Sequence, residues 1–170
     1  MAEIIPIKPW RYHRDLSKDI EDLTAPLFDV VSQKQRDALY QNAHNSIHLS
    51  VPKLPDPAER AATILNDWKA RGVIVQDPLP GIYVYYQHFR IAGNPKPYCR
   101  KGFICHIRTY DWDEKVILRH ENTIPKAVND RVDLLEKTEL HSSPTHGLYT
   151  DPSFQLEQYM DEAMTTPLLE

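Results

Sequence analysis

Hydrophobic and polar positions follow one another in short stretches along the chain, and their spacing predicts strands and helices of modest length. Runs of alternating apolar residues predict strands, which end at prolines or at turn residues. The predicted strands cover residues 4–7, 46–51, 73–76, 82–91, 98–110, 116–118 and 145–149. Because Gly93-Asn94-Pro95 separates the two longest, we expect those two strands to pair in antiparallel fashion.

Apolar residues at helical spacing, preceded by capping residues, predict helices between these strands. The predicted helices cover residues 33–41, 57–71, 124–140 and 151–164. Ser32 and Gln35 have the spacing of a capping box at the start of the first helix. Asp56 and Pro57 are suited to begin the second, and Gly72 is suited to end it.

The order of these elements, with paired strands in the middle, predicts an α+β (mixed α/β) fold. We expect a central mixed, largely antiparallel sheet that is flanked by helices. A chain of 170 residues is long enough for one domain, or it forms the N-terminal portion of a larger protein.

Composition narrows the class of protein. Hydrophobic residues make up 41% and charged residues 26%, which is a globular balance. The net charge of −4 argues against a general nucleic-acid binder. No apolar run approaches the roughly twenty residues that span a membrane, and no signal peptide begins the sequence. We therefore expect a cytoplasmic protein without a membrane or nucleic-acid partner, whose oligomeric state the sequence leaves open.

The stretch with the most suggestive chemistry is Arg119–Arg131, which is unusually polar for the start of a helix. Thr123 or Asn122 is the expected N-cap. Lys126 then falls in the first turn, where a cation opposes the helix dipole. Either Asp130 pairs with Lys126 one turn later, or an anion at the helix start contacts both the lysine and the free N–H groups.

Other polar residues near this helix are candidates for the same site. His120 and Glu121 precede the cap, and a histidine beside a carboxylate can serve as an acid–base pair or bind a metal. Asp29 lies in an apolar stretch, where a carboxyl group needs a partner or a function. A plainer interpretation also stays open, namely a solvated, well-capped helix and a loop aspartate in an Asx turn. Cys99 and Cys105 do not have the spacing of a structural zinc site, so no metal ligand is expected from them.

Several spaced stretches carry a resemblance to a known family. They are Ala25–Ser32, Asn42–His48, Gly81–Gln87, Arg119–Thr123 with Lys126, Asp130 and Arg131, and Ser143–Tyr149. Through them the chain resembles the domain of unknown function 1015 family along almost its whole length. The first stretch departs mildly from that family, which usually has a second proline and a tyrosine where Leu27 and Phe28 stand.

That family is similar to free-serine kinases and, more remotely, to the ParB and sulfiredoxin-like fold. The resemblance therefore implies a nucleotide-dependent phosphotransferase or small-metabolite, serine-type kinase, with ATP or ADP and Mg²⁺ in the full-length protein. It implies catalytic roles for His120, Glu121 and Asp29, and cofactor binding by Thr123, Lys126 and Arg131. A non-catalytic nucleotide- or protein-binding module, with the polar face of the helix 124–140 as its surface, is the alternative.

One departure from the family pattern bears on activity. The family continues into an Asp-Gly-His-His-Arg signature, which this sequence does not contain. In the ParB-like relatives the matching segment contributes to the nucleotide site. We therefore expect this chain to be a truncated N-terminal portion that is inactive alone.

Overall fold

The computed structural model describes residues 2–120 and 122–167, and these residues form an α+β fold, as predicted. The chain divides into two compact units. Unit 1 comprises the described residues of Met1–Pro9, Pro78–Arg119 and Gly147–Glu170. Unit 2 comprises those of Trp10–Asp77 and His120–His146. Each unit is therefore built from segments that are distant in the sequence.

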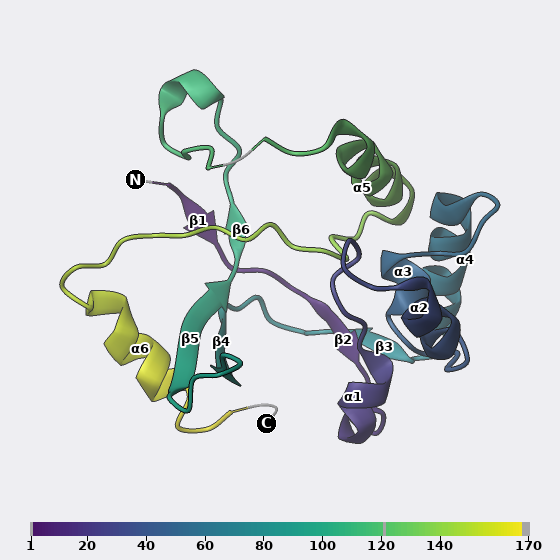
Figure 1. Ribbon diagram of the computed structural model, residues 1–170, viewed down its shortest axis with the longest axis horizontal. Helices are drawn as coiled ribbons and strands as arrows, with labels where there is room; N and C mark the ends of the chain where they lie inside the picture. The colour runs from purple at the N-terminus through teal and green to yellow at the C-terminus, as the bar shows by residue number, and fades with distance from the viewer. Residues whose placement is uncertain (1, 121, 168–170) are drawn as a thin grey trace. The chain divides into compact units, whose positions relative to one another are not determined.

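Unit 1 contains the long antiparallel hairpin that the sequence predicts. Strand β4 (Tyr83–Arg90) pairs with β5 (Pro97–Ile104) along its whole length, and Gly93 in the turn has a φ of 79°. The chain continues from β5 into the short β6 (His106–Ile107), which pairs with β1 (Ile4–Ile5) (Figure 1). A 3-10 turn over Trp112–Glu114 follows.

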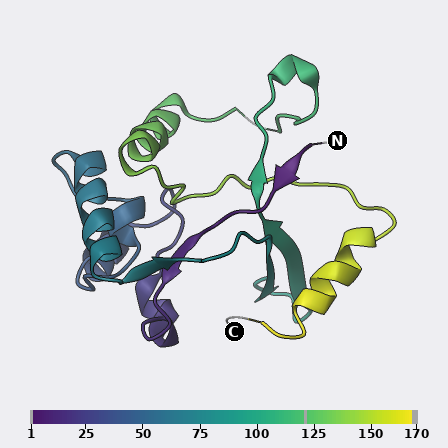
Figure 2. The same cartoon turned by 180° about the vertical axis from the view of Figure 1, so that it is seen from behind.

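Helix α6 (Gln155–Ala163) lies beside β5 within unit 1 (Figure 2). The carboxylate of Asp151 accepts hydrogen bonds from the backbone N–H groups of Gln155, at 3.1 Å, and Leu156, at 2.8 Å. These bonds satisfy donors that a helix start leaves unpaired. The last predicted helix is confirmed, but it begins at Gln155 and not at Asp151.

Unit 2 contains a hydrophobic cluster of buried side chains. Strand β2 (Trp10–Tyr12) pairs with β3 (Ile74–Gln76), and helices pack beside them. The helices are α1 (Ile20–Leu23), α2 (Gln33–Leu39), α3 (Ile47–Ser50), α4 (Pro57–Ala70) and α5 (Pro125–Thr138), with a 3-10 turn over Ser17–Asp19. The buried cluster consists of Leu49, Leu65, Trp68, Val73 and Ile74, with Trp10 and Tyr12 packed against it.

Two predicted helices are confirmed together with their end signals. The capping box of Ser32 and Gln35 begins α2. Helix α4 has Pro57 at its first position, and Gly72 follows it with a φ of 68°, a conformation that glycine adopts readily. Asp56 is the N-cap residue of α4, as predicted, but its side chain makes no capping hydrogen bond.

The predicted strand over Ser46–Val51 is wrong, because this segment forms the short helix α3. The fully buried Asn45 explains the difference. Its side-chain NH₂ donates to the carbonyl oxygens of Asp22 and Thr24, and its side-chain oxygen accepts the N–H of Ile47 at 2.9 Å. These bonds turn the chain at the position where an apolar alternation alone predicts an extended strand.

The predicted strands over 116–118 and 145–149 are also wrong. Leu118 and Leu148 are 75% and 92% exposed, and short apolar stretches without a partner strand gain no ladder of hydrogen bonds. The pairing is antiparallel throughout the described residues, but it forms three two-stranded sheets instead of one central sheet. Among the helices of the described residues, none is long and apolar enough to cross a membrane.

Candidate functional site

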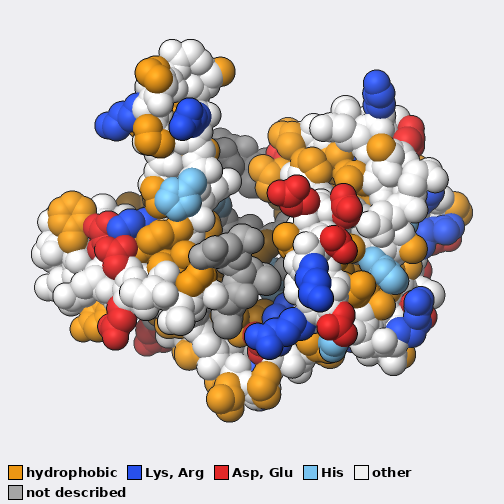
Figure 3. Space-filling view, turned by 90° about the horizontal axis from the view of Figure 1, so that it is seen from below, with side chains coloured by type: hydrophobic (Ala, Val, Ile, Leu, Met, Phe, Trp, Pro, Cys, Tyr) orange, Lys and Arg blue, Asp and Glu red, His pale blue; other side chains and the backbone are white. Residues whose placement is uncertain are grey.

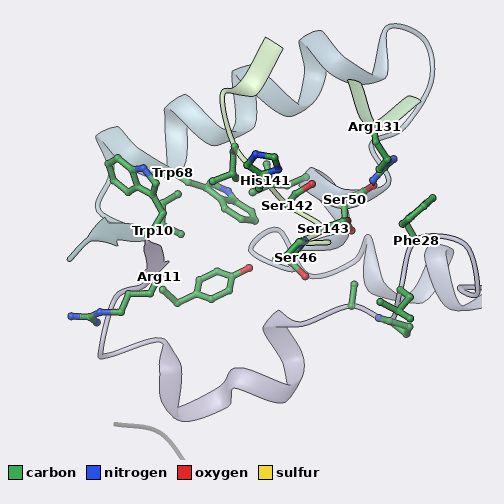
Figure 4. A pocket seen from close by; sticks show the side chains of 18 residues that line it. Trp10, Arg11, Phe28, Ser46, Ser50, Trp68, Arg131, His141, Ser142 and Ser143 are labelled. Carbon is green, nitrogen blue, oxygen red and sulfur yellow. The ribbon is translucent and has the colours of Figure 1, made fainter. Parts of the chain in front are cut away.

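A pocket of about 440 Å³ lies within unit 2 (Figure 4). Its walls come from β2 and β3, the segment before α2, helices α3, α4 and α5 with the N-cap residue of α3, and the loop after α5. Ligand pockets in proteins commonly measure about 300–1,000 Å³, so this cavity has the size of a small-molecule site.

Aromatic side chains of β2 and α4 form one end of the pocket. Trp10 and Tyr12 are two positions apart on β2, so their side chains lie on the same face of the strand. Arg11 lies on the other face and forms an ion pair with Asp77. The ring of Tyr12 lies 6.0 Å from that of Trp68, which is 2% exposed. The Tyr12 hydroxyl donates to backbone carbonyl oxygens, and burial raises its pKa, so Tyr12 stays a neutral phenol.

Arg131 forms the opposite end of the pocket. Residues 131, 134 and 138 share one face of α5, on which Leu134 and Thr138 are buried, so the side chain of Arg131 also turns inward. Its Nη1 donates to the carbonyl oxygen of Ser50 at 2.7 Å, at the end of α3. The guanidinium carbon lies 4.2 Å from the centre of the Phe28 ring.

No carboxylate within residues 2–120 and 122–167 forms an ion pair with Arg131. Burial lowers the pKa of Arg131 and the neighbouring Asp130 raises it, but an arginine keeps its charge in proteins. Arg131 Nε and Ser50 Oγ are both buried, and neither has a hydrogen-bond partner among the described residues. A buried polar group without a partner costs about 1–3 kcal/mol, so this end of the pocket is suited to an oxyanion.

Hydroxyl groups and one imidazole lie between the two ends (Figure 4). They belong to Ser46, Ser50, His141, Ser142 and Ser143. Such groups can donate to or accept from sugar hydroxyls and phosphate oxygens. No described residue that lines the pocket is an aspartate or glutamate, and no cluster of three or more His, Cys, Asp or Glu side chains occurs among the described residues. The lining therefore does not fit a Mg²⁺ site, which usually includes a carboxylate.

The predicted caps of α5 are wrong. Ile124 is the N-cap, with φ −75° and ψ 121°, and its side chain makes no capping hydrogen bond. A residue before proline is held in this extended region, so Pro125 decides where the helix begins. Lys126 is exposed, and no ion pair with Asp130 occurs among the described residues, so the first of the two alternatives for Lys126 is not seen.

The structure brings only one of the described candidate residues into the pocket. Arg131 lines it, whereas the exposed side chains of His120, Thr123, Lys126 and Asp29 do not contribute to its wall. Glu121 lies outside the described residues. The functional roles suggested for these side chains stay predictions.

Sequence reasoning missed most of the lining. Ser46 and Ser50 lie in the segment taken for a strand, and His141, Ser142 and Ser143 follow α5 without any catalytic spacing. A signal did exist, because stretches that carry the family resemblance contain lining residues. They include Pro26 and Phe28 in the first stretch, Ser46 in the second, Arg131 in the fourth and Ser143 in the last.

Comparison with known proteins places the chain in a family. A family described as "Protein of unknown function (DUF1015)" matches residues 4–170, and the chain belongs to this family. No curated protein and no solved structure matches the chain.

Proposed function

We propose that this protein binds a phosphate-bearing small molecule in the pocket of unit 2, and that it takes part in nucleotide-dependent phosphoryl transfer to a small, serine-type metabolite. The observation that carries the proposal is the guanidinium of Arg131, which is partly buried and has no acidic partner among the described residues. A covered charge without a counter-charge is unfavourable, and an oxyanion ligand offsets that cost. Arginine also has the planar donor geometry that suits phosphate oxygens.

Phosphoryl transfer asks a protein mainly to position its substrates and to stabilise negative charge. In this proposal Arg131 neutralises a phosphate, and the hydroxyl groups beside it orient the phosphate oxygens. Lys126 and His120, near the start of α5, are exposed and do not line the pocket. In this proposal their side chains move toward the ligand after it has bound. The described residues of the lining include no carboxylate that could hold a metal ion beside the phosphate.

Calorimetry tests the binding step with inorganic phosphate, ADP and ATP as separate probes. We expect the Arg131→Met variant to bind each probe about tenfold to a hundredfold more weakly, which corresponds to losing one charge-assisted hydrogen bond or two. Arg60→Met is the matched control, because Arg60 is an exposed arginine of α4 outside the pocket. If the folded chain binds none of the three probes, the proposal is wrong.

Appearance of phosphoserine from ATP and serine tests the transfer step. A folded protein that binds phosphate but never phosphorylates serine favours the alternative, a non-catalytic binding module. Exposed Lys126 and Asp130, which pair with no described residue, are the surface for that alternative. A double Lys126→Ala, Asp130→Ala variant that keeps its phosphate affinity but loses a protein partner would support it.

A further inference from the structure

The two ends of the pocket differ in chemistry, and they lie apart in the close view (Figure 4). Trp10 and Trp68 lie at one end, whereas Arg131 and Phe28 lie at the other. The labelled serines and His141 lie between them. A ligand that fills the pocket therefore meets aromatic rings, then hydroxyl groups, and then a guanidinium.

The aromatic end offers ring surface, and Arg11, the charged lining residue at this end, is already paired with Asp77. The hydroxyl of Tyr12 is already engaged, at 2.8 Å from the His44 carbonyl oxygen and 3.1 Å from that of Leu23. Trp10 is partly exposed, and the ammonium group of Lys69 lies 4.7 Å from the centre of its ring. Aromatic side chains of this kind bind planar rings by stacking, and the stacking depends little on which ring is bound.

The size of the cavity argues against a lone phosphate or a phosphorylated amino acid. Either ligand would occupy only a small part of about 440 Å³ and would leave the aromatic end without a contact. Filling the cavity requires a molecule with a planar ring, a hydroxyl-bearing middle and an anionic end. A nucleoside phosphate has these three parts in this order.

We propose that the pocket binds a nucleoside phosphate lengthwise, with its base against Trp10, its ribose beside the serines and its phosphate at Arg131. The inference rests on the proposed function, which places a phosphate at Arg131, and it adds that the pocket receives the nucleotide and not the serine-type acceptor. For transfer, the hydroxyl of the acceptor must then reach the phosphate at the Arg131 end of the pocket.

Calorimetry on the whole chain separates the contributions of the two ends. The probes are inorganic phosphate, phosphoserine, adenosine and AMP. We expect AMP to bind at least about tenfold more tightly than phosphate or phosphoserine, because it also contacts the aromatic end. Trp10→Ala should reduce AMP affinity about tenfold and leave phosphate affinity unchanged. Arg131→Met should reduce AMP affinity to that of adenosine and leave adenosine affinity unchanged.

Two further variants serve as controls. Trp10→Phe keeps an aromatic ring and should retain most of the AMP affinity, even if Trp10→Ala loosens β2. Trp112→Ala removes a tryptophan of unit 1, which does not line the pocket, and should leave AMP affinity unchanged. Thermal unfolding of each variant reports whether it is folded.

The outcomes distinguish this inference from the proposed function. If phosphate and phosphoserine bind as tightly as AMP, and Trp10→Ala changes nothing, the lengthwise nucleotide is wrong while the phosphate site stands. If the folded Arg131→Met variant binds AMP as tightly as the original chain does, the orientation is wrong. If no probe binds to the folded chain, both proposals fail.

Discussion

Lys101 of unit 1 and Arg131 of unit 2 are both partly covered cations, but the fold treats them differently. Lys101 lies on β5, and its ammonium group forms ion pairs with Glu157 and, at 2.8 Å, with Asp161 of α6. The Tyr86 hydroxyl donates to Asp161 as well. Arg131 has a backbone carbonyl and an aromatic ring around it, and no described carboxylate.

The difference distinguishes a cation that stabilises the fold from a cation that is a candidate for binding a ligand. The hydrogen bonds of Lys101 hold α6 to the hairpin, so its position is explained by the fold of unit 1 alone. The position of Arg131 leaves Nε without a partner, and nothing among the described residues offsets that cost. On the exposed face drawn in Figure 3, basic and acidic side chains lie intermixed, which is the ordinary pattern of a solvated surface.

The largest expected effect is stabilisation by a phosphate-bearing ligand. At a ligand concentration of 100 times Kd, AMP should raise the free energy of unfolding by about 2.7 kcal/mol, since it binds only the folded state. In Arg131→Met, with tenfold to hundredfold weaker binding, this gain should fall to about 0.4–1.4 kcal/mol at the same AMP concentration. Thermal unfolding with and without AMP measures both, and an undiminished ligand-induced gain in the variant would contradict the comparison.

Lys101→Met should weaken the fold of unit 1 without changing ligand binding, the reverse of what is expected for Arg131→Met. The variant leaves Glu157 and Asp161 close together without their cation, so α6 should detach more easily from β5. We expect amide hydrogens of α6 to exchange several-fold faster, while AMP affinity in unit 2 stays unchanged. Arg108→Met, which removes an exposed ion pair with Glu3, is the matched control and should leave α6 unaffected. Unchanged exchange in α6 would show that Lys101 does not hold the helix.

Much of the local structure could be predicted from the sequence, because its causes are local. The box of Ser32 and Gln35, the Pro57 start of α4 and the hairpin around Gly93 each depend on residues within a few positions. The errors have distant causes. Asn45 reaches the carbonyl oxygens of Asp22 and Thr24, about twenty residues away, and thereby turns a predicted strand into α3.

The pocket was predictable only in part for the same reason. Arg131 is noticeable in the sequence as a cation in a polar helix, but its partner Ser50 lies 81 residues away. The other lining residues become a group only when β2, α3 and the loop after α5 meet within unit 2. Lys126, the oddest residue in the helical pattern, is exposed in the structure, so its unusual position did not identify a buried site.

A pH titration tests whether the ion pair between Lys101 and Asp161 holds α6 in unit 1. The hydrogen bond from Lys101 and that from Tyr86 lower the pKa of Asp161 below its ordinary value of 3.8. A carboxylate whose pKa is lower in the folded state stabilises the fold above its unfolded pKa, and this contribution is lost as the pH falls through the folded pKa. We therefore expect the docking of α6 to weaken below about pH 3.8, as hydrogen exchange of α6 amides reports.

Asp161→Asn removes this titration and serves as its control. At neutral pH the α6 amides of the variant should already exchange faster than those of the original chain. Lowering the pH should then increase their exchange rate by a smaller factor than in the original chain. An equal acid response in both chains would assign the effect to other carboxylates, such as Glu157 beside the same lysine.

The smallest effect, and the closest test of the unpaired atoms in unit 2, is expected from Ser50→Ala. The variant removes a buried hydroxyl that has no hydrogen-bond partner among the described residues, so the free energy of unfolding without ligand should stay within about 0.5 kcal/mol or rise slightly. AMP affinity should fall about twofold to tenfold, as for one neutral hydrogen bond. Ser32→Ala gives the contrast, because its hydroxyl caps α2 and its loss should cost about 1 kcal/mol with no change in affinity. If Ser50→Ala destabilised the ligand-free chain as much as Ser32→Ala and left AMP affinity intact, the Ser50 hydroxyl would serve the fold, as Lys101 does, and not the ligand.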